Sequence, residues 1–287
     1  MTTERPMRPD PTIPTIGIFD SGVGGLSVLR AIRGLRPDMG IVYVADQAHV
    51  PYGPRPLEQV RGFARGIAAH LIGQEAKLVV VACNAASAAA LHNLREDFPG
   101  TPFVGMEPAV KPAVSSSNTG TVGVLATPAT FQGQLYAHVV EKFAAGVKVL
   151  TSTCPGLVQR IEACDLNGPE TRAILEEALL PMLAEGADSI VLGCTHYPFV
   201  IPLIQSIVGS GVSVIDPSPA VARQADRLLA ELGYPAPAEG RSAEDASPLR
   251  ICTTGEPGAL GRMLPTLLGE PCEVYPLQWI AGSLTVP

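Results

Sequence analysis

Short apolar runs rich in β-branched residues alternate with longer amphipathic stretches along most of this chain. We expect the apolar runs to form strands at residues 15–20, 40–45, 77–83, 101–105, 121–126, 146–151, 188–194, 212–216 and 250–254. The stretches between them have helical periodicity, and we expect helices at residues 26–36, 56–74, 85–97, 130–144, 171–185 and 219–232. Strands that alternate with helices are typical of parallel sheets joined by right-handed crossovers. The pattern therefore predicts an α/β fold.

Two pairs of similar segments are separated by nearly the same distance along the chain. The segment IGIFDS resembles VGVLAT, and their glycines, Gly17 and Gly123, are 106 positions apart. Cys83 in VVVACNAASAAA and Cys194 in SIVLGCTHYPFV each follow an apolar run, and they are 111 positions apart. Two independent pairs of segments with nearly the same spacing favour an internal duplication. Because the spacing is long, the repeated unit is a whole domain.

The repeat and the composition together predict where the domains lie. We expect a first α/β domain of residues 15–106 plus 217–287 and a second α/β domain of residues 107–216. The segment at 235–248 is rich in proline, alanine and charge and is expected to be a surface loop. The proline-rich residues 1–14 are expected to be a disordered tail.

Composition and charge narrow the possible classes of function. The 287 residues are 46% hydrophobic and 16% charged, which is typical of a globular protein of about two domains. The net charge of −7 argues against non-specific nucleic-acid binding, which requires a basic surface. No apolar stretch reaches the roughly 18–20 residues of a membrane span, and no signal peptide is evident. We therefore expect a cytoplasmic protein that binds neither nucleic acid nor membrane.

The two cysteines of the repeat are the first candidates for chemistry. Six cysteines in a chain of this length do not make a disulfide scaffold. Cys83 and Cys194 each follow an expected strand, and ligands of open α/β sheets bind outside the carboxyl ends of the strands. One thiol from each of two similar halves suggests a symmetric task, such as moving a proton between the two faces of one carbon.

Simpler interpretations of these cysteines stay open at this point. Free cysteine is among the most buried residue types, so Cys83 alone could be an inert core thiol. His196 is a plausible proton partner for Cys194, or a surface histidine beside a core cysteine. The pair Cys194 and His196 lacks the spaced second pair of a structural zinc site, so no metal is expected.

Two polar loops follow the first two expected strands. The loop DSGVGG starts at Asp20, and Ser27 replaces the last glycine of the dinucleotide pattern GxGxxG. Its glycines and the following helix N-terminus would suit a small carboxylate, although a tight turn capped by Asp20 explains them too. The loop DQAHVPYG, which starts at Asp46, is either a rigid turn or a binding loop.

These motifs together resemble those of the glutamate racemases, a family of cofactor-independent amino-acid racemases. The segments IGIFDSGVGGLSVL, DQAHVPYG, VACNAASA, ATPAT, CPGLV followed by a glutamate, and LGCTHYP have the order and spacing of that family over roughly residues 15–280. The resemblance implies two pseudo-symmetric three-layer α/β domains with parallel sheets and an active site in the cleft between them. It also implies interconversion of L- and D-glutamate, which supplies D-glutamate for peptidoglycan.

Carried over motif by motif, the resemblance implies roles for four catalytic residues. Cys83 is implied as the base that takes the α-proton of D-glutamate, and Cys194 as the base for L-glutamate. Asp20 is implied to assist Cys83, and His196 to assist Cys194. An amino-acid α-proton is a weak acid, so fixed electrostatics must stabilise the carbanion without a cofactor.

The resemblance also implies supporting acids and a set of substrate-binding residues. Asp46 and Glu162 match further acidic positions of the family. The implied substrate-binding residues are Asp20, Ser21, Pro51, Tyr52, Gly53, Asn84, Ala85, Thr127, Thr130, Thr195 and His196. We expect no cofactor and no metal, a small-molecule substrate (L- or D-glutamate), and a homodimer.

One position departs from the family pattern. The family usually has Cys-Asn-Thr where this chain has Cys83-Asn84-Ala85. Loss of a hydroxyl that faces a charged substrate group would cost roughly 1.5–3 kcal/mol of binding. A racemase for aspartate or another small amino acid therefore stays as an alternative. A thiol hydrolase that uses Cys194 with His196, and a non-catalytic amino-acid binding protein with two lobes, are alternatives of other classes.

Overall fold

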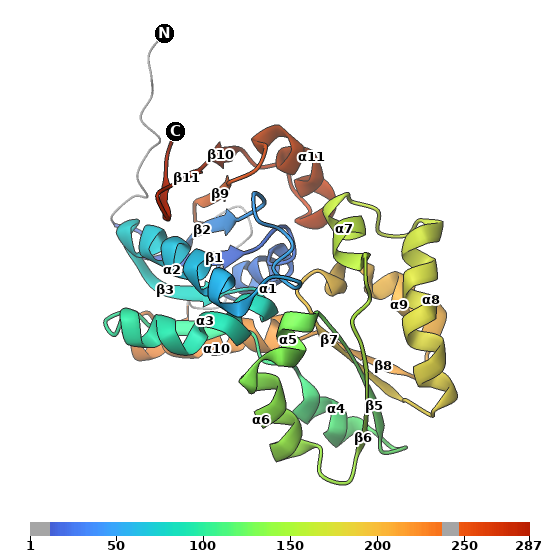
Figure 1. Cartoon of the computed structure of the whole chain (residues 1–287). Helices are drawn as coiled ribbons and strands as arrows, with labels where there is room; N and C mark the ends of the chain where they lie inside the picture. The colour runs from blue at the N-terminus through green and yellow to red at the C-terminus, as the bar shows by residue number, and fades with distance from the viewer. Residues whose placement is uncertain (1–11, 237–246) are drawn as a thin grey trace.

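A computed structural model of the chain describes residues 12–236 and 247–287. Within these residues the strands form two parallel sheets and one antiparallel hairpin, with helices packed around the sheets (Figure 1). The predicted α/β class with parallel sheets is confirmed. Residues 1–11 of the expected tail and 237–246 of the expected surface loop lie outside the described part, whereas the Pro14 carbonyl accepts a hydrogen bond from Gly40 N beside the first sheet.

The first sheet has the strand order β10-β9-β2-β1-β3-β4, and all its pairs are parallel. Its strands are β1 (Thr15–Asp20), β2 (Gly40–Ala45), β3 (Ala76–Val81), β4 (Phe103–Gly105), β9 (Leu249–Thr253) and β10 (Val274–Pro276). Pairing of β9 with β2 returns the C-terminal part of the chain to the sheet that its N-terminal part begins. The hairpin of β11 (Gln278–Ile280) and β12 (Ser283–Thr285) follows and packs on the helix after β2.

The second sheet has the strand order β6-β5-β7-β8 and is also parallel. Its strands are β5 (Thr121–Ala126), β6 (Lys148–Ser152), β7 (Ser189–Gly193) and β8 (Ser213–Ile215). The central strand β5 pairs with β6 and β7, as β1 pairs with β2 and β3 in the first sheet. This correspondence agrees with the similarity of the segments IGIFDS and VGVLAT.

Five of the six expected helices lie close to their predicted ranges, the sixth is divided in two, and the structure has further helices that were not predicted. The bounds are α1 (Leu26–Leu35), α2 (Leu57–Gly73), α3 (Asn84–Asp97), α4 (Val110–Ser116), α5 (Pro128–Gln132), α6 (Gln134–Phe143), α7 (Leu157–Glu162), α8 (Pro169–Ala184), the 3-10 turn η1 (Tyr197–Val200), α9 (Ile201–Val208), α10 (Ser218–Glu231) and α11 (Pro257–Leu267). The helix expected at 130–144 is divided at Gly133, where the backbone is extended (φ −73°, ψ 139°).

Alternation along the strands explains why each sheet has helices on both faces. Ile16 and Ile18 of β1 belong to the core shared with α1, α10 and α11, whereas Phe19 belongs to the core under α2 and α3. The same period-two pattern places Val124 on the α4 and α6 face of the second sheet and Leu125 on the α8 face. Each sheet is thus the middle of three layers.

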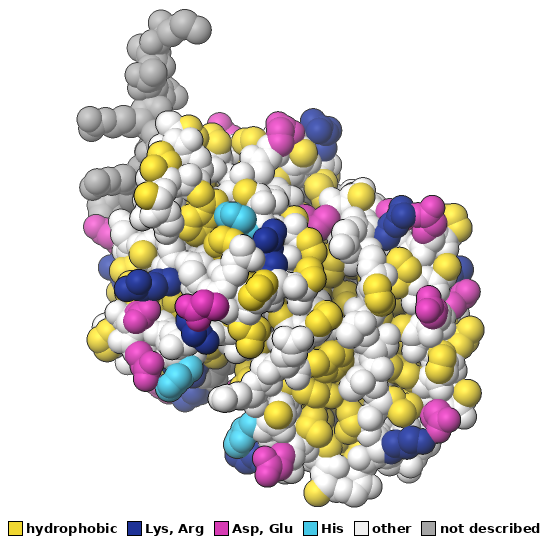
Figure 2. All heavy atoms as spheres, viewed as in Figure 1, with side chains coloured by type: hydrophobic (Ala, Val, Ile, Leu, Met, Phe, Trp, Pro, Cys, Tyr) yellow, Lys and Arg dark blue, Asp and Glu magenta, His cyan; other side chains and the backbone are white. Residues whose placement is uncertain are grey.

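One hydrophobic core continues from the first sheet into the second. The cluster that contains Ile18 and Leu29 beside the first sheet also contains Leu179, Leu192 and Leu203 beside the second. On the face drawn in Figure 2, charged side chains of both signs are scattered around the molecule, and hydrophobic side chains gather toward the lower centre of the view. The domain limits at 106 and 217 stay a prediction.

Candidate active site

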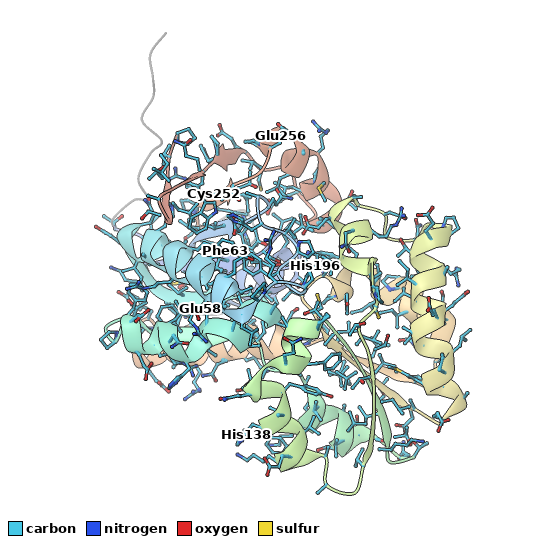
Figure 3. All side chains as sticks on the ribbon, in the orientation of Figure 1. Glu58, Phe63, His138, His196, Cys252 and Glu256 are labelled. Carbon is cyan, nitrogen blue, oxygen red and sulfur yellow. The ribbon has the colours of Figure 1, made fainter. Side chains whose placement is uncertain are left out.

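The carboxyl ends of the central strands of both sheets face one cavity. Residues just after β1, β3, β5 and β7 line it, which is where parallel sheets place their ligands. The lining residues are Ser21, Pro51, Tyr52, Gly53, Cys83, Asn84, Ala85, Thr127, Val158, Cys194, Thr195 and His196. His196 lies at the junction of the two halves (Figure 3). The two thiols separated by 111 positions therefore meet in a single site.

The cavity is small, and larger hollows flank it. It holds about 20 Å³, which is room for about one water molecule. Pro51 and Val158 also line a neighbouring hollow of about 220 Å³ and another of about 280 Å³. A hollow of about 690 Å³ beside α2 and Trp279 is larger, but neither Cys83 nor Cys194 lines it. We assign the site to the small cavity because it contains both thiols.

On the first-sheet side, Cys83 lies at the start of a helix beside a buried carboxylate. Cys83 is the N-cap of α3, and its sulfur accepts a hydrogen bond from Ala86 N at 3.4 Å. Asp20 is fully buried and accepts hydrogen bonds from Ser21 N at 2.7 Å and Gly25 N at 2.6 Å. The Asp20 carboxylate is close enough to the Cys83 thiol for the two groups to interact electrostatically.

Burial dominates the protonation of this first acid–base pair. It raises the pKa of Cys83 well above that of a free thiol, and the charge of Asp20 raises the pKa further. Burial likewise raises the pKa of Asp20, although the charge of His196 partly offsets the increase. The pair therefore favours the proton-bound form, and Asp20 lies behind Ser21 and Cys83 instead of lining the cavity.

On the second-sheet side, Cys194, His196 and Glu162 form a chain of hydrogen-bonding groups. His196 Nδ1 lies 3.7 Å from Cys194 Sγ, and His196 Nε2 lies 2.6 Å from Glu162 Oε1. Burial disfavours the charged histidine, but the contacts with Cys194 and Glu162 outweigh it and raise the pKa of His196 well above its ordinary value. Glu162 comes from the end of α7, so these hydrogen-bonding groups connect two elements of the second half.

Glu162 stays ionised in spite of its burial. Burial raises its pKa, but hydrogen bonds from His196, Val23 N and Gln47 reverse the effect, so its pKa is lowered. Val23 N donates to Glu162 Oε1 at 2.7 Å. Because the pKa of Glu162 is lowered and that of His196 is raised, the two side chains form an ion pair behind Cys194.

Asp46, the other supporting acid, is fully buried behind Tyr52. Its carboxylate accepts hydrogen bonds from Tyr52 Oη at 2.6 Å, Trp279 Nε1 at 2.7 Å and Thr254 Oγ1 at 2.7 Å, and His49 Nδ1 lies 2.9 Å away. Burial and the charge of Asp46 raise the pKa of Tyr52 well above its ordinary value, so the phenol keeps its proton. Asp46 thus anchors the cavity wall without lining the cavity.

The remaining predicted residues divide into wall and support. Asn84 is buried at the cavity wall, and neither atom of its amide has a hydrogen-bond partner among the residues that the structure describes. Such an amide is available to hydrogen-bond a polar ligand in the cavity. Thr130 lies behind Thr127, with 3.2 Å between their hydroxyls, and Thr195 Oγ1 donates to Asp20 Oδ2 at 3.3 Å. Ala85 lines the wall without a polar atom.

Three residues near the site were missed by sequence reasoning. Val158 lines the cavity, and it lies one helical turn before Glu162 in the same motif. Gln47 directly follows Asp46 and donates to Glu162. Trp279 donates a hydrogen bond to Asp46, and no local pattern connects the two residues, which are 233 positions apart.

Within residues 12–236 and 247–287, no group of three or more His, Cys, Asp or Glu side chains is arranged to hold a metal ion. In the same part of the chain, no helix has the length and apolar character needed to cross a membrane.

Comparison with known proteins agrees with this geometry. Residues 26–225 match the model of the Asp/Glu/hydantoin racemase family. A glutamate racemase of Pseudomonas aeruginosa is 50% identical over 256 residues, which are 89% of this chain and 94% of the relative. A crystal structure of a Bacillus anthracis glutamate racemase isoform matches with a TM-score of 0.81 and 30% identity, over 94% of this chain and 98% of that one.

A further solved structure is similar over most of its length. It is the Escherichia coli glutamate racemase in complex with L-glutamate and the activator UDP-MurNAc-Ala, which matches with a TM-score of 0.79 and 31% identity. The match covers 92% of this chain and 97% of that one. Because the family match and these similarities cover the paired strand ends and both cysteines, the chain belongs to the Asp/Glu/hydantoin racemase family, among the glutamate racemases.

Proposed function

We propose that this enzyme interconverts L- and D-glutamate by a cofactor-independent two-base mechanism in which Cys83 and Cys194 are the bases. The observation that carries the proposal is the meeting of the two thiols, one from each sheet, in one cavity. A proton that leaves one face of the α-carbon must return on the opposite face, and two separate bases provide this directly. The relatives' printed names support glutamate as the substrate.

The proposed steps balance in protons and electrons. In the D-to-L direction, the Cys83 thiolate takes the α-proton and becomes a thiol, and the C–H electron pair stays on the α-carbon. The Cys194 thiol then donates its proton to the opposite face and becomes a thiolate. In the L-to-D direction the two cysteines exchange roles.

The surroundings of each thiol support these roles. The N-terminus of α3 and the Ala86 amide favour a thiolate at Cys83, and Asp20 is placed to hold or accept its proton. The His196–Glu162 ion pair places an imidazole nitrogen 3.7 Å from Cys194 Sγ, within reach for proton exchange with that sulfur. The substrate ammonium would add positive charge between the two sulfurs and offset the burial that raises the pKa of Cys83.

The loops at the strand ends are proposed to bind the substrate and stabilise the carbanion. Asn84 supplies an amide donor and acceptor that have no partners in the described part of the chain, and Ser21, Thr127 and Thr195 supply hydroxyls. A cavity of about 20 Å³ is too small for glutamate, and we propose that its walls open toward the flanking hollows when substrate enters. Closure then excludes water from the carbanion.

The broader setting is proposed from the resemblance. We propose a cytoplasmic homodimer whose D-glutamate is used for peptidoglycan, with domains of residues 15–106 plus 217–287 and of residues 107–216. Chromatography with light scattering would test the dimer. A monomer at micromolar concentration would contradict it.

The test of function is α-proton exchange in deuterated buffer, followed by NMR and polarimetry on metal-free protein dialysed without any cofactor. We expect deuterium in both glutamate enantiomers together with optical inversion. Exchange with aspartate but not with glutamate would assign the enzyme to aspartate instead. No exchange with either amino acid would contradict a racemase and favour a binding protein.

A further inference from the structure

We propose that Gln47 is a positioning residue that fixes the Glu162 carboxylate, and through it His196 and Cys194, when the two halves are together. The proposal rests on the two-cysteine function given above. Gln47 follows β2 of the first sheet, whereas Glu162 ends α7 beside the second sheet. Their hydrogen bond therefore crosses from one half of the molecule to the other.

The two oxygens of Glu162 have different partners. Oε1 receives the hydrogen bond from Val23 N at 2.7 Å and faces His196 Nε2 at 2.6 Å. Oε2 accepts a hydrogen bond from Gln47 Nε2 at 3.2 Å. Gln47 is thus the side chain that fixes the second oxygen, and it limits rotation of the carboxylate about the bond that aims Oε1 at His196.

The orientation of Gln47 is itself fixed from the first sheet. Thr253 Oγ1, at the end of β9, donates to Gln47 Oε1 at 2.8 Å, and it accepts from Gly255 N at 2.9 Å. Because the amide oxygen faces a donor and the amide nitrogen faces a carboxylate, a flipped amide would lose both bonds. The path Thr253–Gln47–Glu162–His196 therefore connects the carboxyl end of β9 in the first sheet with the Cys194 base.

Several charged or titratable groups from different elements face this path. Asp20 at the end of β1 and Tyr43 in β2 interact electrostatically with Glu162, and Cys194 after β7 interacts with His196. Of these groups, His196 is the cation that the Glu162 charge stabilises. Loss of the Gln47 bond would raise the pKa of Glu162, weaken the ion pair and lower the pKa of His196.

Gln47→Leu tests the proposal because leucine has a similar volume and no polar atom. We expect kcat to fall about tenfold, as for loss of a hydrogen bond to a charged group. The alkaline limb of the kcat profile should move to lower pH, because His196 loses its proton earlier. The melting temperature should change little, since Gln47 is half-buried in a loop.

Isotope effects identify which base is affected. The equilibrium constant between enantiomers is one, so kcat/KM must be equal in both directions for any variant. Slower transfer at Cys194 should instead raise the kcat/KM isotope effect with α-deuterated L-glutamate and lower it with α-deuterated D-glutamate. A merely structural loss would leave both isotope effects unchanged.

Companion variants complete the experiment. Thr253→Val should shift the isotope effects in the same direction by a smaller amount, whereas Thr253→Ser should leave them as in the wild type. The double variant Gln47→Leu with Thr253→Val should resemble Gln47→Leu alone. Gln59→Ala, an exposed glutamine on α2, is the matched control. Unchanged isotope effects and pH profile in an active Gln47→Leu variant would overturn the proposal. A wild-type enzyme without racemisation would instead overturn the two-cysteine function.

Discussion

At the residue scale, the two cysteines have similar positions but unlike partners. Cys83 has a helix N-terminus and a buried carboxylate with a raised pKa, whereas Cys194 has an imidazole held by an ionised carboxylate. Asp20, with its raised pKa, favours its protonated form beside Cys83, whereas His196 favours its positively charged form beside Cys194. The internal duplication therefore places two thiols symmetrically and supports them by different chemistry.

Replacement of either thiol tests the two-base mechanism. We expect Cys83→Ser and Cys194→Ser each to lower racemisation by at least ~1000-fold, because a serine hydroxyl is far too weak an acid to form the base at neutral pH. Polarimetry with each enantiomer measures the loss. Cys252→Ser, at a buried thiol away from the cavity, serves as the control. Near-normal turnover by either active-site variant would rule out the mechanism.

Ala85 provides a gain-of-function test. Ala85→Thr restores the hydroxyl usual in the family at the cavity wall, next to Asn84. A hydrogen bond to a charged substrate group should lower KM for glutamate about tenfold. Initial-rate kinetics measure the change, with Ala85→Val as a control of similar shape without the hydroxyl. If valine and threonine give the same KM, the hydroxyl has no role.

At the element scale, the glycine-rich loop between β1 and α1 brings the acids of both halves together. Its amides bind Asp20 through Gly25 and Glu162 through Val23. A Cβ atom at Gly24 would lie 2.5 Å from His196 Nδ1, 2.6 Å from Thr195 Oγ1 and 2.7 Å from Asp20 Oδ2. Glycine is required here because the backbone passes close to catalytic side chains, and no nucleotide is needed to explain it.

Gly24→Ala should therefore inactivate the enzyme. Displacement of His196 or Asp20 by about 1 Å should lower kcat roughly 100-fold or more. Gly34→Ala is the matched control, because nothing lies within 4 Å of a Cβ there and the change should stabilise α1 by up to about 1 kcal/mol. Kinetics and urea unfolding of both variants measure the difference. Full activity of Gly24→Ala would mean that the loop backbone shifts to accept a Cβ atom without displacing His196 or Asp20.

Most elements were predictable because their periodicity is local. The strands at 15–20, 40–45 and 121–126 match their predicted ranges. The prediction of one helix at 130–144 was wrong because Gly133 interrupts it. The apolar periodicity continues on both sides of Gly133, so the break was not evident from the sequence. The short strands β10, β11 and β12 were missed because Pro276, Gln278 and Ser283 interrupt the apolar runs there.

At the scale of the whole molecule, the C-terminal hairpin supports the active-site loop from outside the sheet. Trp279 donates from β11 to Asp46, which holds Tyr52 at the cavity. Its ring also lies beside His49 and Phe63. The end of the chain thereby stabilises a loop that begins more than 230 positions earlier.

Trp279→Phe should remove this bond and keep most of the packing. We expect the free energy of unfolding to fall by roughly 1.5–3 kcal/mol, because a buried carboxylate loses one donor. Urea denaturation measures the loss. Ile280→Thr, at an exposed side chain of the same strand, should leave the stability nearly unchanged. Equal stability of Trp279→Phe and wild type would mean that Thr254, Tyr52 and His49 suffice for Asp46.

The sequence by itself determined the α/β class, the repeat, and the strand-end positions of the two cysteines, because each depends on local periodicity or on spacing along the chain. It also identified the polar loops, since glycine and proline restrict the backbone locally. Only the tertiary structure decided that Asp20, Asp46 and Glu162 stand behind the cavity wall, and that Gln47, Thr253 and Trp279 support them. Those contacts join residues from 115 to 233 positions apart, and their geometry depends on how the two sheets pack.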